Sequence, residues 1–121
     1  ERIAVASAKQ CGRATVPAIF EPRPFADAAA ALGQMMLPSP GIMLVEPSAV
    51  DGALTLGGLA GAPPREATIV VGPEGGWTPE EIEHGSAACR LMTLGARTFR
   101  ADAVAIIALT ALFAHWGEFE R

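Results

Sequence analysis

The 121-residue sequence is poor in several features that mark common classes of protein. Lys9 is its single lysine and its formal net charge is −4, whereas a domain that binds RNA by itself is usually basic. If RNA is a substrate, most phosphate contacts should therefore come from outside this chain. The two cysteines, Cys11 and Cys89, lie far apart without the spacing of a metal site, so we interpret them as buried free thiols.

A signal peptide and a long apolar stretch are also missing. The longest apolar run covers 103–109 and continues past Thr110 to Ala114, well short of the ~20 residues that a membrane-spanning helix needs. We therefore expect a cytoplasmic protein with no membrane contact. The chain begins at Glu1, without a methionine and inside a predicted helix, which suggests a fragment truncated at its N-terminus.

Several familiar catalytic and nucleotide-binding motifs are absent. No lysine follows Gly76, as a P-loop requires, and Gly72, Gly75 and Gly76 lack the GxGxxG spacing of a dinucleotide site. The sequence contains neither the GxSxG motif of serine hydrolases nor the HExxH motif of zinc proteases. A phosphate-gripping nucleotide site is therefore disfavoured. We interpret His84 and His115, both on predicted helices, as surface or interface residues.

What the sequence does contain is an alternation of helical and strand-like segments. Runs such as 42–45 and 67–71 are apolar at every position, a pattern typical of strands covered on both faces in a parallel sheet. The alternation predicts one α/β domain, residues 1–121, with a mainly parallel sheet. We expect helices at 2–10, 25–32 (ended by Gly33), 79 onward and 102–116, strands at 16–20, 42–45, 67–71 and 91–94, and a long loop with room for a short helix at 50–64.

The strongest local signal is TIVVGPEGGWTPEEI at 68–82, where a buried strand leads through a glycine turn into a helix. Thr78 is the expected N-cap, Pro79 takes the first helical position, and Glu81 completes a capping box. Ligands of open α/β sheets bind at the carboxyl ends of the strands, and glycine lets the backbone approach them closely. Glu74 would repel a phosphate but tolerate a ligand with a cationic centre. From the local pattern alone, an ordinary strand–turn–helix connection is an equal alternative.

A second signal, LGARTFRAD at 94–102, again joins a strand to a helix. Arg97 and Arg100 stand three residues apart beside the start of the last helix, and arginine supplies planar, permanently charged donors. A solvated turn with surface arginines is an equal alternative. The segment KQCGR at 9–13 is, taken alone, only the end of a helix. The last predicted helix is apolar around most of its circumference, so we expect it to be buried on more than one side, with a second subunit as one cover.

Three segments together resemble one family. KQCGR at 9–13, VGPEGGW at 71–77 and LGARTFR at 94–100 occur in the order and with about the spacing of the RsmE family, the 16S rRNA uracil-N3 methyltransferases of the SPOUT superfamily. The family pattern is an EQSGR-like motif, then GPEGGF before a capped acidic helix, then LGxRxLRxExA. The resemblance covers nearly the whole chain and is best from Ile69 onward.

The resemblance implies methyl transfer from S-adenosylmethionine to N3 of a uridine in small-subunit (16S) ribosomal RNA, without a metal ion. It also implies a deep trefoil knot near the C-terminus and a homodimer that the last helix helps to form. The cofactor would bind in a bent shape among three loops of the knot, which correspond here to 44–47, 71–76 and 94–100. The cofactor-binding residues implied in this way are Leu44, Val45, Glu46, Val71, Gly72, Pro73, Gly75, Gly76, Leu94, Gly95, Thr98, Phe99 and Arg100.

Catalysis at uracil N3 requires positive charge, because loss of the N3 proton spreads negative charge onto O2 and O4. Arg100 is the first candidate to stabilise that charge, with Arg97 and Arg13 behind it. Glu74 could accept the proton or orient a neighbouring group. It could equally hold the glycine-rich loop at 71–76, called the glycine loop below.

The sequence departs from the family pattern in several places. Ala101, Asp102 and Ala103 stand where the family usually has threonine, glutamate and threonine, while Cys11 replaces a serine and Trp77 a phenylalanine. The resemblance implies that the family's N-terminal PUA-like RNA-binding domain lies outside this sequence, together with the first strand and helix of the methyltransferase domain. Most contacts with 16S rRNA are thus expected from the missing half. Two alternatives stay open: a non-catalytic module for cofactor binding and dimerisation, and a SPOUT methyltransferase acting on another RNA.

Overall fold

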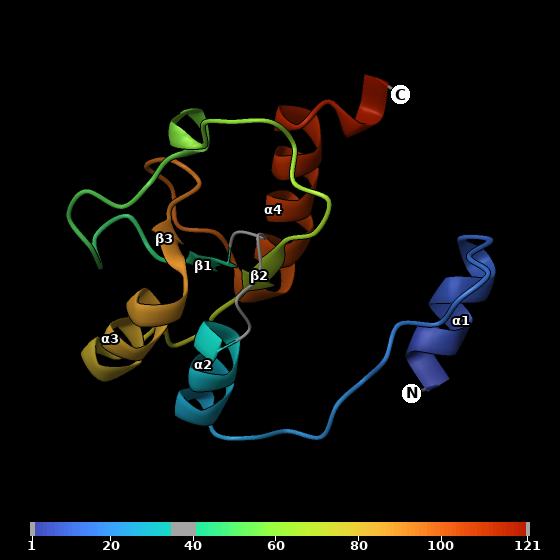
Figure 1. Ribbon diagram of the computed structural model, residues 1–121, viewed down its shortest axis with the longest axis horizontal. Coiled ribbons are helices and arrows are strands. Elements are labelled where there is room, and N and C mark those ends of the chain that lie inside the picture. Colours follow the sequence, from blue (N-terminus) through green and yellow to red (C-terminus); the bar gives the residue numbers. More distant parts are fainter. Residues whose placement is uncertain (1, 35–40, 121) are drawn as a thin grey trace.

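The computed structural model describes residues 2–34 and 41–120 of the chain. Two N-terminal helices precede a small sheet whose strands are connected by loops and by one further helix, and a long helix follows (Figure 1). The elements are α1 (Arg2–Gln10), α2 (Phe25–Gln34), β1 (Gly41–Leu44), the 3-10 helix η1 (Leu56–Gly58), β2 (Thr68–Val70), α3 (Pro79–Ala88), β3 (Arg90–Met92), α4 (Ala101–His115) and the 3-10 helix η2 (Glu118–Glu120).

The three strands form a parallel sheet with β1 in the centre, in the order β2-β1-β3. Ile42 of β1 is in register with Ile69 of β2, and Met43 with Leu91 of β3. Leu54, from the connection between β1 and β2, adds a bridge beside β3, where its N–H donates to the Leu91 carbonyl at 2.9 Å. The predicted α/β class and parallel sheet are therefore confirmed, and the carboxyl ends of all three strands meet at one edge.

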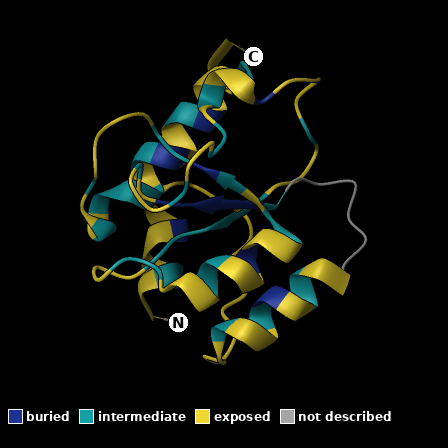
Figure 2. Cartoon of the chain, turned by 90° about the vertical axis from the view of Figure 1, so that its left-hand side faces the viewer, coloured by how far each residue is buried: buried dark blue, intermediate teal, exposed yellow. Residues whose placement is uncertain are grey.

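Helices cover the sheet on both faces because β1 is apolar on both sides. Ile42 and Leu44 point toward α4 and form a core cluster with Met92, Ala108 and Leu112. Met43 points the opposite way, toward α3, and is also completely buried. Helix α2 packs along α3 on that side, and Figure 2 shows the buried residues gathered in the sheet and on the inner side of α4. The pattern of the 42–45 run thus predicted a strand covered on both faces correctly.

The ends of the helices follow local sequence signals closely. Thr78 caps α3: its Oγ1 accepts from the Glu81 N–H at 3.2 Å, and its own N–H donates to the Glu81 carboxylate at 2.9 Å. Helix α2 runs one residue beyond Gly33, where we expected its end. We expect Asp102 to cap or open helix α4; the helix begins at Ala101 with Arg100 as its N-cap, so Asp102 lies in its first turn. Each error in these boundaries is small, as expected for helix ends.

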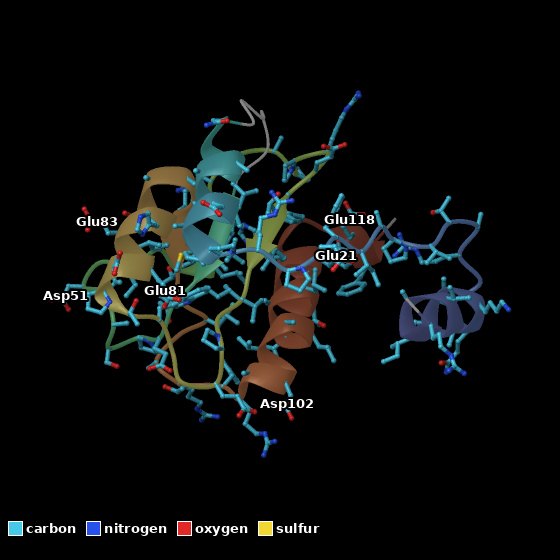
Figure 3. All side chains as sticks on the ribbon, turned by 90° about the horizontal axis from the view of Figure 1, so that it is seen from below. Glu21, Asp51, Glu81, Glu83, Asp102 and Glu118 are labelled. Carbon is cyan, nitrogen blue, oxygen red and sulfur yellow. The ribbon has the colours of Figure 1, made fainter. Side chains whose placement is uncertain are left out.

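The prediction of a strand at 16–20 is wrong. Residues 11–24 contain no strand or helix and are exposed along their whole length, with Val16, Ile19 and Phe20 exposed by 46%, 62% and 77%. Helix α1 lies apart from the sheet in two perpendicular views (Figures 1 and 3). A β-rich segment becomes a strand only where another strand takes its backbone hydrogen bonds and its side chains are covered. Neither condition holds here.

Other sequence expectations concern single residues and the membrane. Cys11 and Cys89 are both free thiols, but Cys11 is exposed and Cys89 only half-buried, so the expectation that both are buried is wrong. Partial burial raises the pKa of the Cys89 thiol. In the described part of the chain, every helix is too short or too polar to span a bilayer.

Gly85 of α3 packs closely against Met43 of the sheet, and a substitution can test this contact. A Cβ atom at Gly85 would overlap the Met43 sulfur, which is completely buried and has little room to move. Alanine improves helix propensity by up to ~1 kcal/mol, but forcing a methyl group into a packed core costs about 1–3 kcal/mol. We expect Gly85→Ala to lower the free energy of unfolding by about 1 kcal/mol in urea denaturation. Gly57→Ala, which meets nothing within 4 Å, is the control. A variant as stable as the wild type would contradict the close packing of α3.

Candidate active site

A cavity of about 450 Å³ opens at the edge of the sheet where the three parallel strands end. Each strand contributes the residues that follow it, which is where open α/β sheets bind their ligands. The lining residues are Leu44, which ends β1, with Val45 and Glu46 after it; Gly72, Pro73, Glu74, Gly76 and Trp77 after β2; Thr93, Leu94, Arg97, Thr98, Phe99 and Arg100 after β3; and Ala101 and Val104 from α4.

Most of the residues expected to bind a cofactor line this one cavity. The exceptions are Val71, Gly75 and Gly95. Val71 packs against the hydrophobic core cluster instead, so its side chain supports the glycine loop from behind. Gly95 has a φ of +95°, which a side chain would strain, and so it shapes the third loop without lining the cavity.

Arg13 is not at the cavity, although we named it as a catalytic candidate. Its N–H donates to the Ala8 carbonyl at 2.9 Å, which ties it to the end of α1. Because α1 lies apart from the sheet, Arg13 is carried away from the site (Figure 1). Glu74, Arg97 and Arg100, the other candidates, all line the cavity.

The glycine loop is held in shape by its own backbone. The Gly76 N–H donates to the Pro73 carbonyl at 3.0 Å and closes a turn, and Gly76 has a φ of +75°. A side chain is disfavoured at this φ, so glycine is required here for conformational reasons. The same glycine brings the loop against Glu46 at the end of β1: a Cβ atom at Gly76 would lie 3.4 Å from the Glu46 carboxylate. The first and second loops therefore lie side by side at the cavity.

Trp77 is the residue of the site that sequence reasoning missed. The family pattern identifies it only as the replacement of a phenylalanine. In the structure its indole Nε1–H donates to the Leu44 carbonyl at 2.8 Å, and its ring lies 4.8 Å from that of Phe25 in α2. The sequence signal was the indole N–H itself, a donor that phenylalanine lacks, but only the fold shows its acceptor. Thr93, Ala101 and Val104 also line the cavity, although the sequence did not predict them as site residues.

The charged groups at the cavity are two carboxylates and two guanidinium groups. Glu46 and Glu74 follow β1 and β2, whereas Arg97 and Arg100 follow β3, and all four are exposed. The site therefore offers carboxylates for a cationic ligand group and guanidinium groups for an anionic one. No group of three or more His, Cys, Asp or Glu side chains that could hold a metal ion occurs in the described residues.

Arg100 forms a bidentate ion pair with Asp102 at the start of α4. Its Nε and terminal nitrogen donate to the two carboxylate oxygens at 3.1 and 3.0 Å. This hydrogen bonding raises the pKa of Arg100 and lowers that of Asp102. The side chains are 82% and 61% exposed, and Figure 3 shows Asp102 at the outer end of α4. Exposed pairs contribute little to stability, so the guanidinium can leave Asp102 for another anion at small cost.

The two histidines take structural positions away from the cavity lining. The His84 ring lies 2.8 Å from the Glu80 carbonyl within α3, at the surface. The His115 ring, at the end of α4, lies 2.9 Å from the carbonyl of Leu59, a core residue of the β1–β2 connection. His115 thus connects the end of α4 to the β1–β2 connection.

Comparison with known proteins gives a family and two related structures. Residues 1–113 match the family described as the RNA methyltransferase domain. A methyltransferase of Legionella pneumophila, solved with bound SAM, is 27% identical with a TM-score of 0.75 over 93% of this chain and 43% of its own. The ribosomal RNA small subunit methyltransferase E of Neisseria gonorrhoeae, bound to S-adenosyl methionine, is 28% identical with a TM-score of 0.78 over 95% of this chain and 46% of its own. No curated protein sequence matches.

These similarities agree with the resemblance drawn from the three motifs. The chain spans less than half the length of either solved protein. The family match nevertheless covers residues 1–113, which include all three strands, the glycine loop and the arginine-bearing loop. The chain therefore belongs to the RNA methyltransferase domain family.

Proposed function

We propose that this domain binds S-adenosylmethionine in the cavity at the strand ends and serves the methylation of a ribosomal RNA base. The observation that carries the proposal is the cavity itself: three loops after parallel strands converge there, and one of them carries two arginines. Both related structures hold this cofactor. The volume, about 450 Å³, lies within the range of small-molecule pockets.

The lining residues suit such a ligand chemically. Leu94, Phe99 and Val104 supply apolar surface for a flat adenine ring, and the glycine loop lets the backbone approach closely. Glu46 and Glu74 place carboxylates where a cationic group is favoured and a phosphate is not. When bound, the cofactor supplies a methyl group on a positively charged sulfur atom.

The residues after β3 suit the other reactant. We propose uridine N3 in small-subunit ribosomal RNA as the target, supported by the motifs and by the name of the Neisseria relative. As the N3 proton leaves, charge grows on O2 and O4, and Arg100, with Arg97 behind it as the second candidate, would stabilise that charge; both line the cavity. Glu74 either accepts the proton or holds the glycine loop. The base must be unpaired or flipped to reach the cavity.

The C-terminal helix supports a homodimer as part of the proposal. Ile106, Leu109 and Phe113 are 69%, 43% and 42% exposed, and their spacing places them on one face of α4. Phe119 extends this apolar stripe through an edge contact with Phe113, with ring centroids 6.2 Å apart. A second copy of the chain would cover the stripe.

The family resemblance supports two further proposals. We propose that the chain forms a deep trefoil knot and that the protein is cytoplasmic.

The net charge favours a second candidate for the isolated chain. At −4 the chain offers little attraction for a polyanion. It would then bind cofactor and dimerise without methylating RNA unless a basic part of the full-length protein is attached. Methylation of small-subunit RNA by the chain alone and by the full-length protein separates these possibilities. Mapping the modified nucleotide tests the choice of RNA.

Filling the cavity tests the proposed cofactor site. Ala101 lines the cavity at the first turn of α4 and is half-buried. We expect Ala101→Phe to weaken binding of S-adenosylhomocysteine at least tenfold, on the order of the cost of a misfitted side chain in a packed site. Isothermal titration calorimetry measures this. Ala96→Phe, in the loop between β3 and α4, is exposed and outside the lining, and it should bind like the wild type. Equal binding by both variants would place the cofactor elsewhere.

Removing the Arg100 guanidinium separates binding from chemistry. We expect Arg100→Ala in the full-length protein to lower kcat by about a hundredfold, the order of loss for one donor to a developing anion. The affinity for S-adenosylhomocysteine should change by less than about threefold, since the interaction belongs to the transition state. Arg90→Ala is the matched control, because Arg90 is exposed and lies at the start of β3, whereas the cavity lies where the strands end. Equal losses in kcat and affinity would reassign Arg100 to cofactor binding.

A charge in the apolar stripe of α4 tests the dimer. We expect the 12.5 kDa chain to sediment as a dimer and Ile106→Asp to sediment as a monomer, since a buried unpaired carboxylate opposes association. Ala87→Asp, at an exposed position of α3, should leave the dimer intact. A wild-type monomer in analytical ultracentrifugation would rule out the proposed interface.

A further inference from the structure

Trp77 contacts three separate segments around the cavity. Its indole N–H reaches the carbonyl of Leu44, the last residue of β1, across 33 positions of sequence. Its ring lies against Phe25, the first residue of α2, at 4.8 Å and 39°. A Cβ atom at Gly72 would lie 2.8 Å from the same ring, so the glycine loop folds directly onto it. Trp77 also lines the cavity.

The hydrogen bond connects two of the three loops that form the cavity. Leu44 is 6% exposed and belongs to the central strand, so its carbonyl is held in place by the core. Trp77 follows the glycine loop and precedes the N-cap of α3. Through the indole N–H, the loop after β2 is therefore attached to the rigid end of β1. Among aromatic side chains of suitable size, phenylalanine fills the same place but cannot donate this bond.

We propose that Trp77 is a positioning residue: its indole N–H fixes the glycine loop against the end of β1 and so sets the shape of the ligand cavity. The role rests on the proposed function, because the ligand is the one assigned to this cavity. Trp77 acts through Leu44 and Gly72. A loop held in its binding conformation loses less entropy when the ligand arrives, so loss of the bond alone is expected to lower affinity.

The test is calorimetric titration of Trp77→Phe with S-adenosylhomocysteine. An aromatic ring is kept between Gly72 and Phe25, while the second ring of the indole and its N–H are lost. We expect binding about fivefold weaker than in the wild type, the effect of losing one hydrogen bond of ordinary strength. Trp116→Phe is the matched control, because Trp116 packs against the core cluster and lies outside the cavity lining. It should bind like the wild type even though its stability also falls.

A spectroscopic readout tests the hydrogen bond independently of the ligand. The two tryptophans give two indole signals in ¹H–¹⁵N spectra, which the two phenylalanine variants assign. The Trp77 indole proton should exchange with solvent slowly and shift when S-adenosylhomocysteine is added. If Trp77→Phe does not fold, Trp77→3-benzothienylalanine keeps both rings and replaces only the N–H by sulfur, and the same loss of affinity is expected.

The outcomes separate this role from the proposed function. If the wild-type chain does not bind S-adenosylhomocysteine, the cofactor assignment fails and the positioning role fails with it. If the wild type binds and Trp77→Phe binds equally well or more tightly, only the positioning role is overturned. The same holds if Trp116→Phe loses as much affinity as Trp77→Phe, because the effect would then follow general stability.

Discussion

The fold depends on one short strand that is buried on both faces and paired on both edges. In β1, Ile42 and Leu44 pack toward α4 while Met43 packs toward α3, and β2 and β3 take its backbone hydrogen bonds. Such a strand has no freedom to shift register, because a slip of one residue would exchange its two faces. The positions of both neighbouring strands follow from it. So does the edge at which their carboxyl ends meet, and this edge is where the cavity opens.

The same constraint explains why the site is built mostly from backbone and loops. Parallel strands deliver their following residues to one place, and the glycine loop, the end of β1 and the loop after β3 meet there without long side chains to span the gap. Contacts between loops then fix the geometry. The Trp77 indole hydrogen bond to Leu44 ties the second loop to the first, and the Gly76 turn lies beside Glu46. The third loop has its own tie, from the Thr93 hydroxyl to the Gly95 carbonyl at 2.9 Å.

Local signals in the sequence predicted what local physics determines. The unbroken apolar run at 42–45 and the capping box of Thr78 and Glu81 depend on neighbours in sequence, and both were predicted correctly. The strand expected at 16–20 failed because pairing is a property of the whole fold, and its residues have no neighbouring strand. The motif resemblance named most of the residues that line the cavity. It did not name Trp77, whose hydrogen-bond partner lies 33 residues away. Arg13 was assigned to the site by the same resemblance and follows α1 away from it.

The cavity is unequally organised for its two proposed reactants, and this bears on how they would bind. The side proposed for the cofactor is held by a buried strand, a closed turn and an indole hydrogen bond. The arginine side is exposed, with Arg100 held only by Asp102 at the surface. A guanidinium in water stabilises a developing anion weakly, and the effect grows when solvent is excluded. Under the proposed function, the arriving base and the surface that carries it must supply that exclusion. Cofactor binding would then be a property of this chain by itself, whereas turnover would require the RNA to cover Arg100 and draw it away from Asp102.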